Sequence, residues 1–334
     1  MADDVALTLA EALDLARAAL QRLGMSEQAA RALSRATVDA EAAGRTAVGF
    51  AHLKDYLTAL AEGRIAGRAE PLVTAPVPAV MKCDAMGGVA QYGFEIAREE
   101  LAAKARTFGL AVFAAHNSYT TGELGWYAGR LAEEGLVALA ATNPPALMAA
   151  AGSTRPVYGT NPLAFAAPLS DGRIVLADQS SSATAFVSIR AAAERGEPIP
   201  EGWALDGEGR PTTDAGAALK GALLAFGGAR GANIALMVEV LAAGLTGAHW
   251  SLDAPDFLSG SVSPGSGLFV LAIAPQVLAD DFPRRLTAQI ERLSGEYGVH
   301  VPGLGRLEAM RRAESHGIVL PRQLFDSISS FRRN

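Results

Sequence analysis

The sequence predicts an α/β fold, and two observations support this class. Half of the 334 residues are apolar, which is enough to fill a sizeable core. Beyond residue 80, short apolar runs of strand length alternate with longer runs that have helical spacing. Such alternation is typical of strands covered by helices.

The chain is expected to open with two capped helices. Thr8 and Glu11 have the spacing of a capping box, and apolar residues follow at helical intervals until Gly24 ends the run. Ser26 then caps a second helix, which extends to about Ala43. Both helix starts are therefore marked by a side chain that can satisfy free backbone N–H groups.

A third helix is expected from Phe50 to Leu60. The following stretch, 63–78, is rich in glycine and proline and is expected to be a linker into the main body. Helices are then expected at 88–108, 122–134, 186–195 and 229–245, and strands at 110–115, 136–141, 174–177 and 268–274.

Composition and charge argue against several classes of protein. The single cysteine, Cys83, cannot form an internal disulfide, and no zinc-site spacing occurs, so we expect a cytoplasmic protein without a metal. A net charge of −6 argues against a nucleic-acid partner. The acidic start at residues 1–4 and the lack of an apolar run of about 20 residues argue against a leader or a membrane span.

The usual nucleotide-binding and hydrolytic motifs are absent. No G-x-G-x-x-G follows a strand and no G-x-x-x-x-G-K-[ST] occurs, which excludes a Rossmann fingerprint and a P-loop. There is also no H-E-x-x-H and no G-x-S-x-G. A dinucleotide would therefore have to be held by other glycines and loops.

Several polar segments follow the buried strands or precede a helix. Hydroxyls and free backbone N–H groups at such places can meet an anion, although ordinary capping and turn formation explain each segment equally well. The last of them brings Arg230 to the start of a helix. The segments are 116–125, 142–145, 158–162, 177–182 and 226–231.

The order of these segments resembles the type-2 malate/lactate dehydrogenase family, which is unrelated to the Rossmann-fold dehydrogenases. This family also contains ureidoglycolate, sulfolactate and diketogulonate oxidoreductases and the Δ1-piperideine-2-carboxylate/Δ1-pyrroline-2-carboxylate reductases. The resemblance spans nearly the whole chain. The matching pieces are 42–56, Asn117-Ser118 with Gly122 and Tyr127, Thr142-Asn143, 159–162, 178–182, Gly202-Trp203, 211–214 and 227–231.

The resemblance implies a homodimer with a non-Rossmann dinucleotide-binding α/β fold and hydride transfer to C2 of a small 2-oxo or 2-imino acid. We expect a helical N-terminal part, residues 1–80, packed with a C-terminal segment, residues 300–334. Residues 81–299 would form the α/β body that binds NAD(P) and carries out catalysis.

Cofactor contacts carry over from the family residue by residue, and NADP is favoured over NAD. Arg230 stands where the family usually has lysine, so the charge is kept while the geometry of a phosphate contact can change. Thr160 is expected to contact the substrate carboxylate. The expected cofactor contacts are Thr120, Thr121, Gly122, Glu123, Leu124, Asp178, Ser180, Ser181, Ser182 and Arg230.

The sequence departs from the family where the proton donor is expected. The family has Ser-His-Gly after the second helix, and here alanine and valine stand before Gly49, at Ala47 and Val48. His52 replaces an arginine that holds the substrate carboxylate. A second family histidine is matched by Thr120, and a carboxylate that orients the donor in some members is matched by Ser188.

This departure favours a particular substrate. Reduction of a ketone leaves an alkoxide, and a positioned proton donor there is worth about 10² to 10⁴ in rate. A cyclic imine can bind already protonated and needs no such donor. We therefore expect reduction of Δ1-pyrroline-2-carboxylate or Δ1-piperideine-2-carboxylate to L-proline or L-pipecolate. His52 is either a substitute donor, the cationic partner of the carboxylate, or a packed structural residue.

Two other functions stay open at this stage. The first is a 2-oxo acid or 2-hydroxy acid dehydrogenase of the malate/lactate type, which obtains its proton through His52 or water. The second is a non-catalytic homologue that acts as a binding protein.

Overall fold

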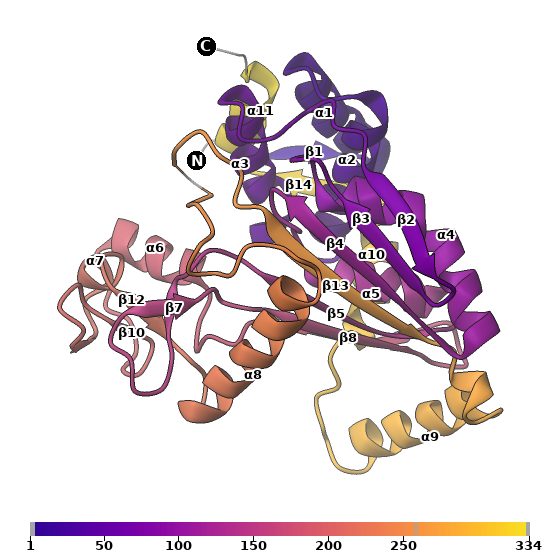
Figure 1. Ribbon diagram of the computed structural model, residues 1–334. Helices are drawn as coiled ribbons and strands as arrows, with labels where there is room; N and C mark the ends of the chain where they lie inside the picture. The colour runs from indigo at the N-terminus through magenta and orange to yellow at the C-terminus, as the bar shows by residue number, and fades with distance from the viewer. Residues whose placement is uncertain (1–3, 258, 332–334) are drawn as a thin grey trace.

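The computed structural model describes residues 4–257 and 259–331 and is organised around a mixed seven-stranded sheet (Figure 1). This arrangement confirms the predicted α/β class. Residues 1–3, from the acidic start, and residues 332–334, from the expected C-terminal segment, lie outside the described residues. In spatial order the strands are β2 (Leu72–Val77), β3 (Val80–Asp84), β4 (Leu110–Ser118), β13 (Ser266–Ile273), β5 (Val137–Asn143), β8 (Leu163–Pro168) and β9 (Ile174–Gln179).

Helices cover both faces of this sheet. One face packs against α4 (Ala90–Phe108) and α5 (Leu124–Glu133), where Phe94, Trp126 and Tyr127 meet edge to face in the main core. The other face packs against α8 (Ala229–Glu239) and the π-helical turn η2 (Val240–Gly244), seen in front of the sheet in Figure 1.

The two ends of the chain come together above the sheet. Strand β1 (Val5–Leu7) pairs antiparallel with β14 (Ile318–Leu320), and a separate apolar core joins the surrounding helices. Thr8 and Ser26 cap the first two helices, as predicted. The helices here are α1 (Leu9–Arg22), α2 (Glu27–Ala42), α3 (Phe50–Ala61), α10 (Leu304–His316) and α11 (Arg322–Ser330), with the 3-10 turn η1 (Thr46–Val48) between α2 and α3.

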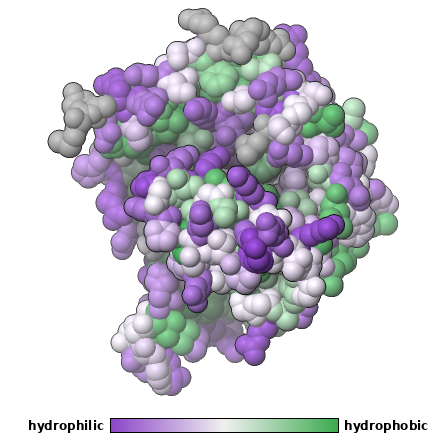
Figure 2. All heavy atoms as spheres, turned by 90° about the vertical axis from the view of Figure 1, so that its left-hand side faces the viewer, coloured by the Kyte–Doolittle hydropathy of each residue, from purple (hydrophilic) through white to green (hydrophobic). Residues whose placement is uncertain are grey.

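A smaller lobe projects beside the large sheet. Its five-stranded sheet has the order β11 (Pro211–Thr212), β10 (Ala204–Leu205), β12 (Ala222–Leu224), β6 (Met148–Ala149) and β7 (Pro156–Tyr158). Helices α6 (Phe186–Arg195) and α7 (Ala215–Ala218) pack against it, and Figure 2, viewed from this side, shows a mixed surface in which hydrophilic patches alternate with paler, less polar ones.

Helix α9 (Phe282–Gly295), which follows the 3-10 turn η3 (Pro275–Val277), stands apart from the other helices (Figure 1). None of the helices in the described residues has the apolar length that crossing a bilayer would take. The same residues hold no group of three His, Cys, Asp or Glu side chains placed to bind a metal ion.

Three local predictions were wrong. The expected linker 63–78 contains β2, an edge strand that tolerates its proline because the register shifts between Thr74 and Val77. The expected helix 122–134 starts only at Leu124, because Gly122 has a φ of 67° and cannot belong to a right-handed helix. The expected helix 229–245 changes from α to π geometry at Val240.

Candidate functional site

The polar segments meet at one edge of the large sheet because of the strand directions. Strands β4 and β5 both run antiparallel to β13, and β9 runs parallel to β5 through β8. The carboxyl ends of β4, β5 and β9 therefore lie at the same edge, where β8 begins. The residues that follow these strand ends belong to the polar segments predicted from the sequence, 116–125, 142–145 and 177–182.

These loops form one wall of a cavity of about 540 Å³. The opposite wall comes from the turn between α2 and α3. We call the two the strand-end wall and the helical wall. The strand-end wall consists of residues 120–124, Thr142, Pro144, Thr160, Pro162, Asp178, Gln179 and Ser180, and the helical wall of residues 44–48 and His52; Ala185 and Phe257 complete the lining.

The helical wall is held from behind by a buried carboxylate. The backbone N–H of Phe50 donates to Oε2 of Glu41 at 2.8 Å, which ties the start of α3 to the end of α2. Burial raises the pKa of Glu41. Gly49 leaves room for this bond, because a Cβ at that position would meet the carboxylate of Glu41.

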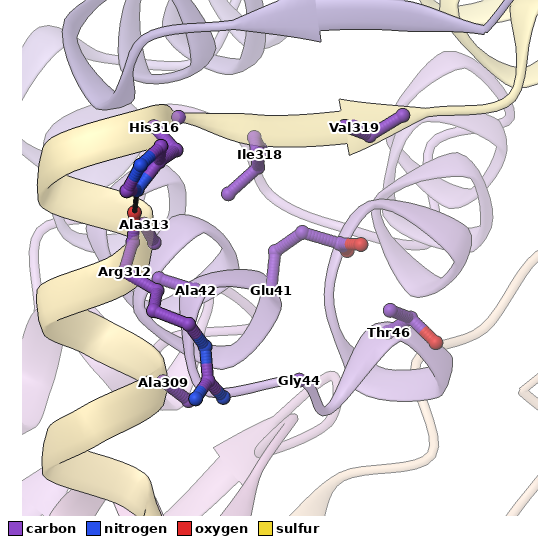
Figure 3. Close-up of a pocket in the computed structure, with 11 residues that line it drawn as sticks. Glu41, Ala42, Gly44, Thr46, Ala309, Arg312, Ala313, His316, Ile318 and Val319 are labelled. Atoms are coloured by element: carbon purple, nitrogen blue, oxygen red, sulfur yellow. Dashed lines mark hydrogen bonds between the residues drawn. The ribbon is translucent and has the colours of Figure 1, made fainter.

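A second hollow lies on the far side of the same turn (Figure 3). Glu41 points into it, and Arg312 of α10 faces it from the opposite side. Gly44 and Thr46 border both the hollow and the cavity. The turn 44–48 thus separates the cavity from the hollow, and some of its residues border both.

His52 is the titratable side chain of the helical wall that is best placed for proton transfer. Its Nδ1 donates to Oδ2 of Asp55 at 2.9 Å, since a carboxylate can only accept. Its Nε2 lies 3.4 Å from Oγ1 of Thr120 and is the nitrogen left to exchange a proton on the cavity side. Thr120 in turn donates to the hydroxyl of Tyr56 at 2.7 Å.

Tyr56 keeps its proton because it is fully buried. Burial is the main cause that raises its pKa to about 12. Gln91 donates to the same phenol oxygen at 3.2 Å, and the ring packs edge-on against His52. Tyr56 therefore fixes Thr120 and the histidine ring in place. Ala47 and Val48, beside His52 in the cavity lining, offer no exchangeable side-chain proton.

The strand-end wall offers backbone donors. The carbonyl of Thr121 accepts from Gln91 and Tyr127, which fixes the loop before α5. In the part of the chain that the structure describes, the N–H groups of residues 121–124 have no acceptor. Consecutive free N–H groups at the start of a ten-residue helix suit a phosphate group, so this wall fits the pyrophosphate of a dinucleotide.

Two carboxylates lie on this wall, and each has a partner. Glu123 is buried and paired with Arg306 of α10 at 2.7 Å, so its charge is largely balanced. Oδ2 of Asp178 accepts from the N–H of Gly125 at 2.7 Å. Burial raises the pKa of Asp178 to about 6, although the Gly125 bond and the charges of Arg45 and Arg306 act in the opposite direction.

The structure brings most of the predicted site residues together at this cavity. His52, Thr120 to Leu124, Thr160, Asp178 and Ser180 all line it. Ser181 and Ser182 are buried behind the lining, where their hydroxyls bond to Asn161 and to Ser180 and Thr184. Their roles remain predictions.

Ser188 and Arg230 lie outside the cavity lining. Ser188 is exposed on α6, and Arg230 is exposed in the first turn of α8. The segment just before α8 approaches the serine loop, because the N–H of Phe226 donates to the carbonyl of Ser181 at 3.1 Å. Arg230 therefore lies near the serine loop but does not line the cavity. Its role also remains a prediction.

Sequence reasoning missed Arg45, Phe257, Asp55 and Arg306. The last of these comes from α10, far along the chain, and nothing local links it to Glu123. The spacing of His52 and Asp55, three residues apart on one helix, was a readable signal.

Comparison with known proteins gives the family of the chain. A family model described as malate/L-lactate dehydrogenase matches residues 7–329. The chain belongs to this family. The prediction of a type-2 malate/lactate dehydrogenase relative, and with it of an NAD(P)-dependent oxidoreductase, is thereby confirmed.

Individual family members point to two substrate classes. The chain is 38% identical to a (2R)-3-sulfolactate dehydrogenase (NADP(+)) from Chromohalobacter salexigens, over 97% of each chain. It is 36% identical to a Δ1-pyrroline-2-carboxylate/Δ1-piperideine-2-carboxylate reductase from Pseudomonas putida, over 96% of this chain and 94% of that one. A crystal structure of Δ1-piperideine-2-carboxylate reductase from Pseudomonas syringae pvar. tomato superposes with a TM-score of 0.93 at 32% identity, covering 98% and 99% of the two chains.

Proposed function

We propose that this protein reduces a cyclic imino acid, Δ1-pyrroline-2-carboxylate or Δ1-piperideine-2-carboxylate, to L-proline or L-pipecolate with NADPH. The observation that carries the proposal is the composition of the helical wall. It has Ala47 and Val48 where the resemblance implies a serine and a proton-donating histidine, and His52 is its one imidazole. The names of the reductase relatives support the same substrate class.

When bound, the nicotinamide would supply the hydride that is added at C2 of the substrate. The chain itself has to bind, orient and protect the reactants. The free N–H groups of residues 121–124 would hold the pyrophosphate, and Thr160 would donate to the substrate carboxylate. Phe257, the large apolar side chain of the lining, would limit the access of water.

The imine reaction suits these residues because its nitrogen brings its own proton. A protonated imine accepts hydride and becomes a neutral amine, so no alkoxide forms and no donor has to neutralise one. His52, oriented by Asp55, would hold the iminium form in place or return a proton to the product nitrogen. A ketone substrate would depend on His52 for every proton that it takes up.

The test is an NADPH oxidation assay with matched substrates. We expect kcat/KM for Δ1-pyrroline-2-carboxylate or Δ1-piperideine-2-carboxylate to exceed the values for pyruvate, oxaloacetate and 3-sulfopyruvate by at least about tenfold, the effect of roughly 1.4 kcal/mol in the transition state. A higher value for any of the 2-oxo acids would overturn the proposal.

A 2-hydroxy acid dehydrogenase is the second candidate, and a specific observation favours it. The sulfolactate dehydrogenase named above has a higher sequence identity to this chain than the reductase from P. putida. In this case His52 would protonate the alkoxide through Nε2. The two candidates predict opposite orders of kcat/KM in the same assay.

The proposal extends to assembly, location and metabolic role. We propose a cytoplasmic homodimer that acts in proline or pipecolate metabolism. The exposed apolar row along α8 and η2, with Met237 and Leu245 each 60% exposed, supports a contact with a second copy. Met237→Glu should lower the molar mass measured by light scattering from dimer to monomer. Leu278→Glu, at an exposed leucine near η3, is the matched control and should leave the mass unchanged.

A further inference from the structure

The proposed substrates all carry a carboxylate, and a cavity that binds one needs a positive charge. The lining contains two acidic residues, Glu123 and Asp178. It contains two basic ones, Arg45 and His52. Glu123 is balanced by Arg306, and the carboxylate of Asp178 accepts from the N–H of Gly125. The permanent positive charge that faces the cavity is therefore that of Arg45.

The backbone of Arg45 is held in one position. Its N–H donates to the carbonyl of Ala40 at 2.8 Å, and its carbonyl accepts from the N–H of Val48 at 3.0 Å. Gly44 and Thr46 border both the cavity and the hollow behind it, whereas Arg45 borders the cavity alone. Arg45 therefore lies on the cavity side of the turn.

The guanidinium is available to a ligand. Among the described residues Arg45 forms no salt bridge and no side-chain hydrogen bond, although its charge does lower the pKa of Asp178 across the cavity. The other basic side chain of the lining, His52, already donates to Asp55. A planar guanidinium with five donors suits a carboxylate, which it can bind through two parallel hydrogen bonds.

We propose that Arg45 is the substrate-binding residue that holds the carboxylate of the imino acid or 2-oxo acid. The inference rests on the proposed function, because that function puts a carboxylate in this cavity. Arg45 would then bind the carboxylate in place of His52, whose ring is small and already bonded to Asp55. Thr160, on the opposite wall, would complete the contact.

The other oxyanion that could reach Arg45 is the 2′-phosphate of NADP. In an extended dinucleotide this phosphate lies at the far end from the nicotinamide. Arg45 lies one 3-10 turn from Val48, on the wall that also carries His52. If His52 faces the reacting carbon, Arg45 is on the substrate side, and the carboxylate is the favoured partner.

The experiment compares Arg45→Met and Arg45→Lys with Arg31→Met, a matched control at an exposed arginine of α2. Steady-state kinetics are measured with Δ1-pyrroline-2-carboxylate, with 1-pyrroline, which lacks the carboxylate, and with NADPH and NADH. We expect Arg45→Met to raise the KM for the carboxylate substrate by about 10- to 100-fold, the loss of one charge-assisted contact. Rates with 1-pyrroline and the NADPH-to-NADH preference should stay unchanged, and Arg45→Lys should recover part of the loss.

Two results would overturn the assignment. One is an unchanged KM for the carboxylate substrate in Arg45→Met. The other is a loss of NADPH preference with the substrate KM unchanged, which would assign Arg45 to the 2′-phosphate. Melting curves of the variants establish that each one folds.

A failure of the proposed function would be distinguishable from a failure of this inference. If the unmodified enzyme reduces none of the substrates, calorimetry with pyrrole-2-carboxylate in the presence of NADPH still tests the residue. Weaker binding to Arg45→Met by a similar factor, with unchanged binding to Arg31→Met, supports the assignment. Equal binding to both variants contradicts it.

Discussion

The strand-end wall and the helical wall of the cavity are built by different means. The strand-end wall takes its form from the sheet, because parallel strand ends and a helix start bring backbone N–H groups to one edge. The helical wall is a turn between two helices, and its chemistry depends on the side chains at Arg45, Ala47, Val48 and His52. A change of side chain can alter the second wall without disturbing the first.

This difference bears on where the chain is expected to depart from its family. Most of the cofactor contacts expected from the resemblance lie on the strand-end wall, whose backbone geometry follows from the sheet. Three of the expected departures, Ala47, Val48 and His52, lie on the helical wall, and a fourth, Thr120, lies on the strand-end wall. We infer that cofactor binding follows mainly from the fold, while the choice of substrate depends mainly on the side chains of one turn.

The largest expected effect comes from His52→Ala on the helical wall. Turnover of a 2-oxo acid should fall by about 10² to 10³, because its alkoxide needs a positioned proton donor, whereas turnover of the cyclic imine, whose nitrogen brings its own proton, should fall less. The affinity for NADPH, measured by fluorescence titration, should stay the same. His316→Ala, at an exposed histidine that borders only the hollow behind the turn, is the control and should leave both values unchanged. Equal loss of NADPH affinity would mean that the two walls are not separable.

Asp178→Asn tests the strand-end wall through its pH dependence. The folded protein holds the proton of Asp178 up to about pH 6, whereas an unfolded aspartate releases it near 3.8. Between these values the wild type should lose stability relative to the asparagine variant as pH rises, and the difference should level off above pH 6 at no more than about 3 kcal/mol. Urea unfolding of both proteins at pH 4.5, 5.5 and 7.5 measures this. A difference that grows in the opposite direction would contradict the assigned burial.

Gly49→Ala tests the support of the helical wall. The added methyl would meet the carboxylate of Glu41 and break its bond to Phe50, at a cost of about 1 to 3 kcal/mol in the free energy of unfolding. Gly305→Ala, at an exposed helix position with open space around it, should instead be neutral or slightly stabilising. If the two variants melt alike, Glu41 does not hold the turn as described.

Val48→His should give the smallest of these effects on activity. It tests most directly whether side chains of the helical wall determine the choice of substrate. It restores a titratable ring at the position where the family has its donor, so kcat/KM for a 2-oxo acid should rise about tenfold relative to the imine. Val48→Phe supplies a ring without a proton and should not change this ratio. A rise with both variants would point to cavity shape instead of proton donation.

Local signals in the sequence predicted much of the fold. The hydroxyls of Thr8 and Ser26 cap helices through backbone groups only three residues away, and the apolar runs of β4, β5 and β13 are visible without any partner. Strands β1 and β14 could not be found in this way, because each is three residues long and gains its stability from a partner near the other end of the chain.

The candidate site was predictable to the same extent. The strand-end loops follow apolar runs, so Thr120 to Leu124 and Asp178 could be placed together from strand direction alone. Arg45 and Phe257 belong to segments without a strand, and only the packing of α3 and of the loop around Phe257 brings them to the cavity. Their presence in the cavity depends on contacts between distant parts of the chain, which a local sequence pattern does not predict.

The pairing of β1 with β14 has a consequence for the way the pocket is lost on unfolding. The helices that carry the helical wall share their core with α10, β14 and α11, which lie far from them along the chain. The large sheet is paired without these elements, whereas the turn at 44–48 takes its backing from the core to which they belong. Detachment of the β1–β14 pair should therefore open one wall of the pocket while the other is still folded.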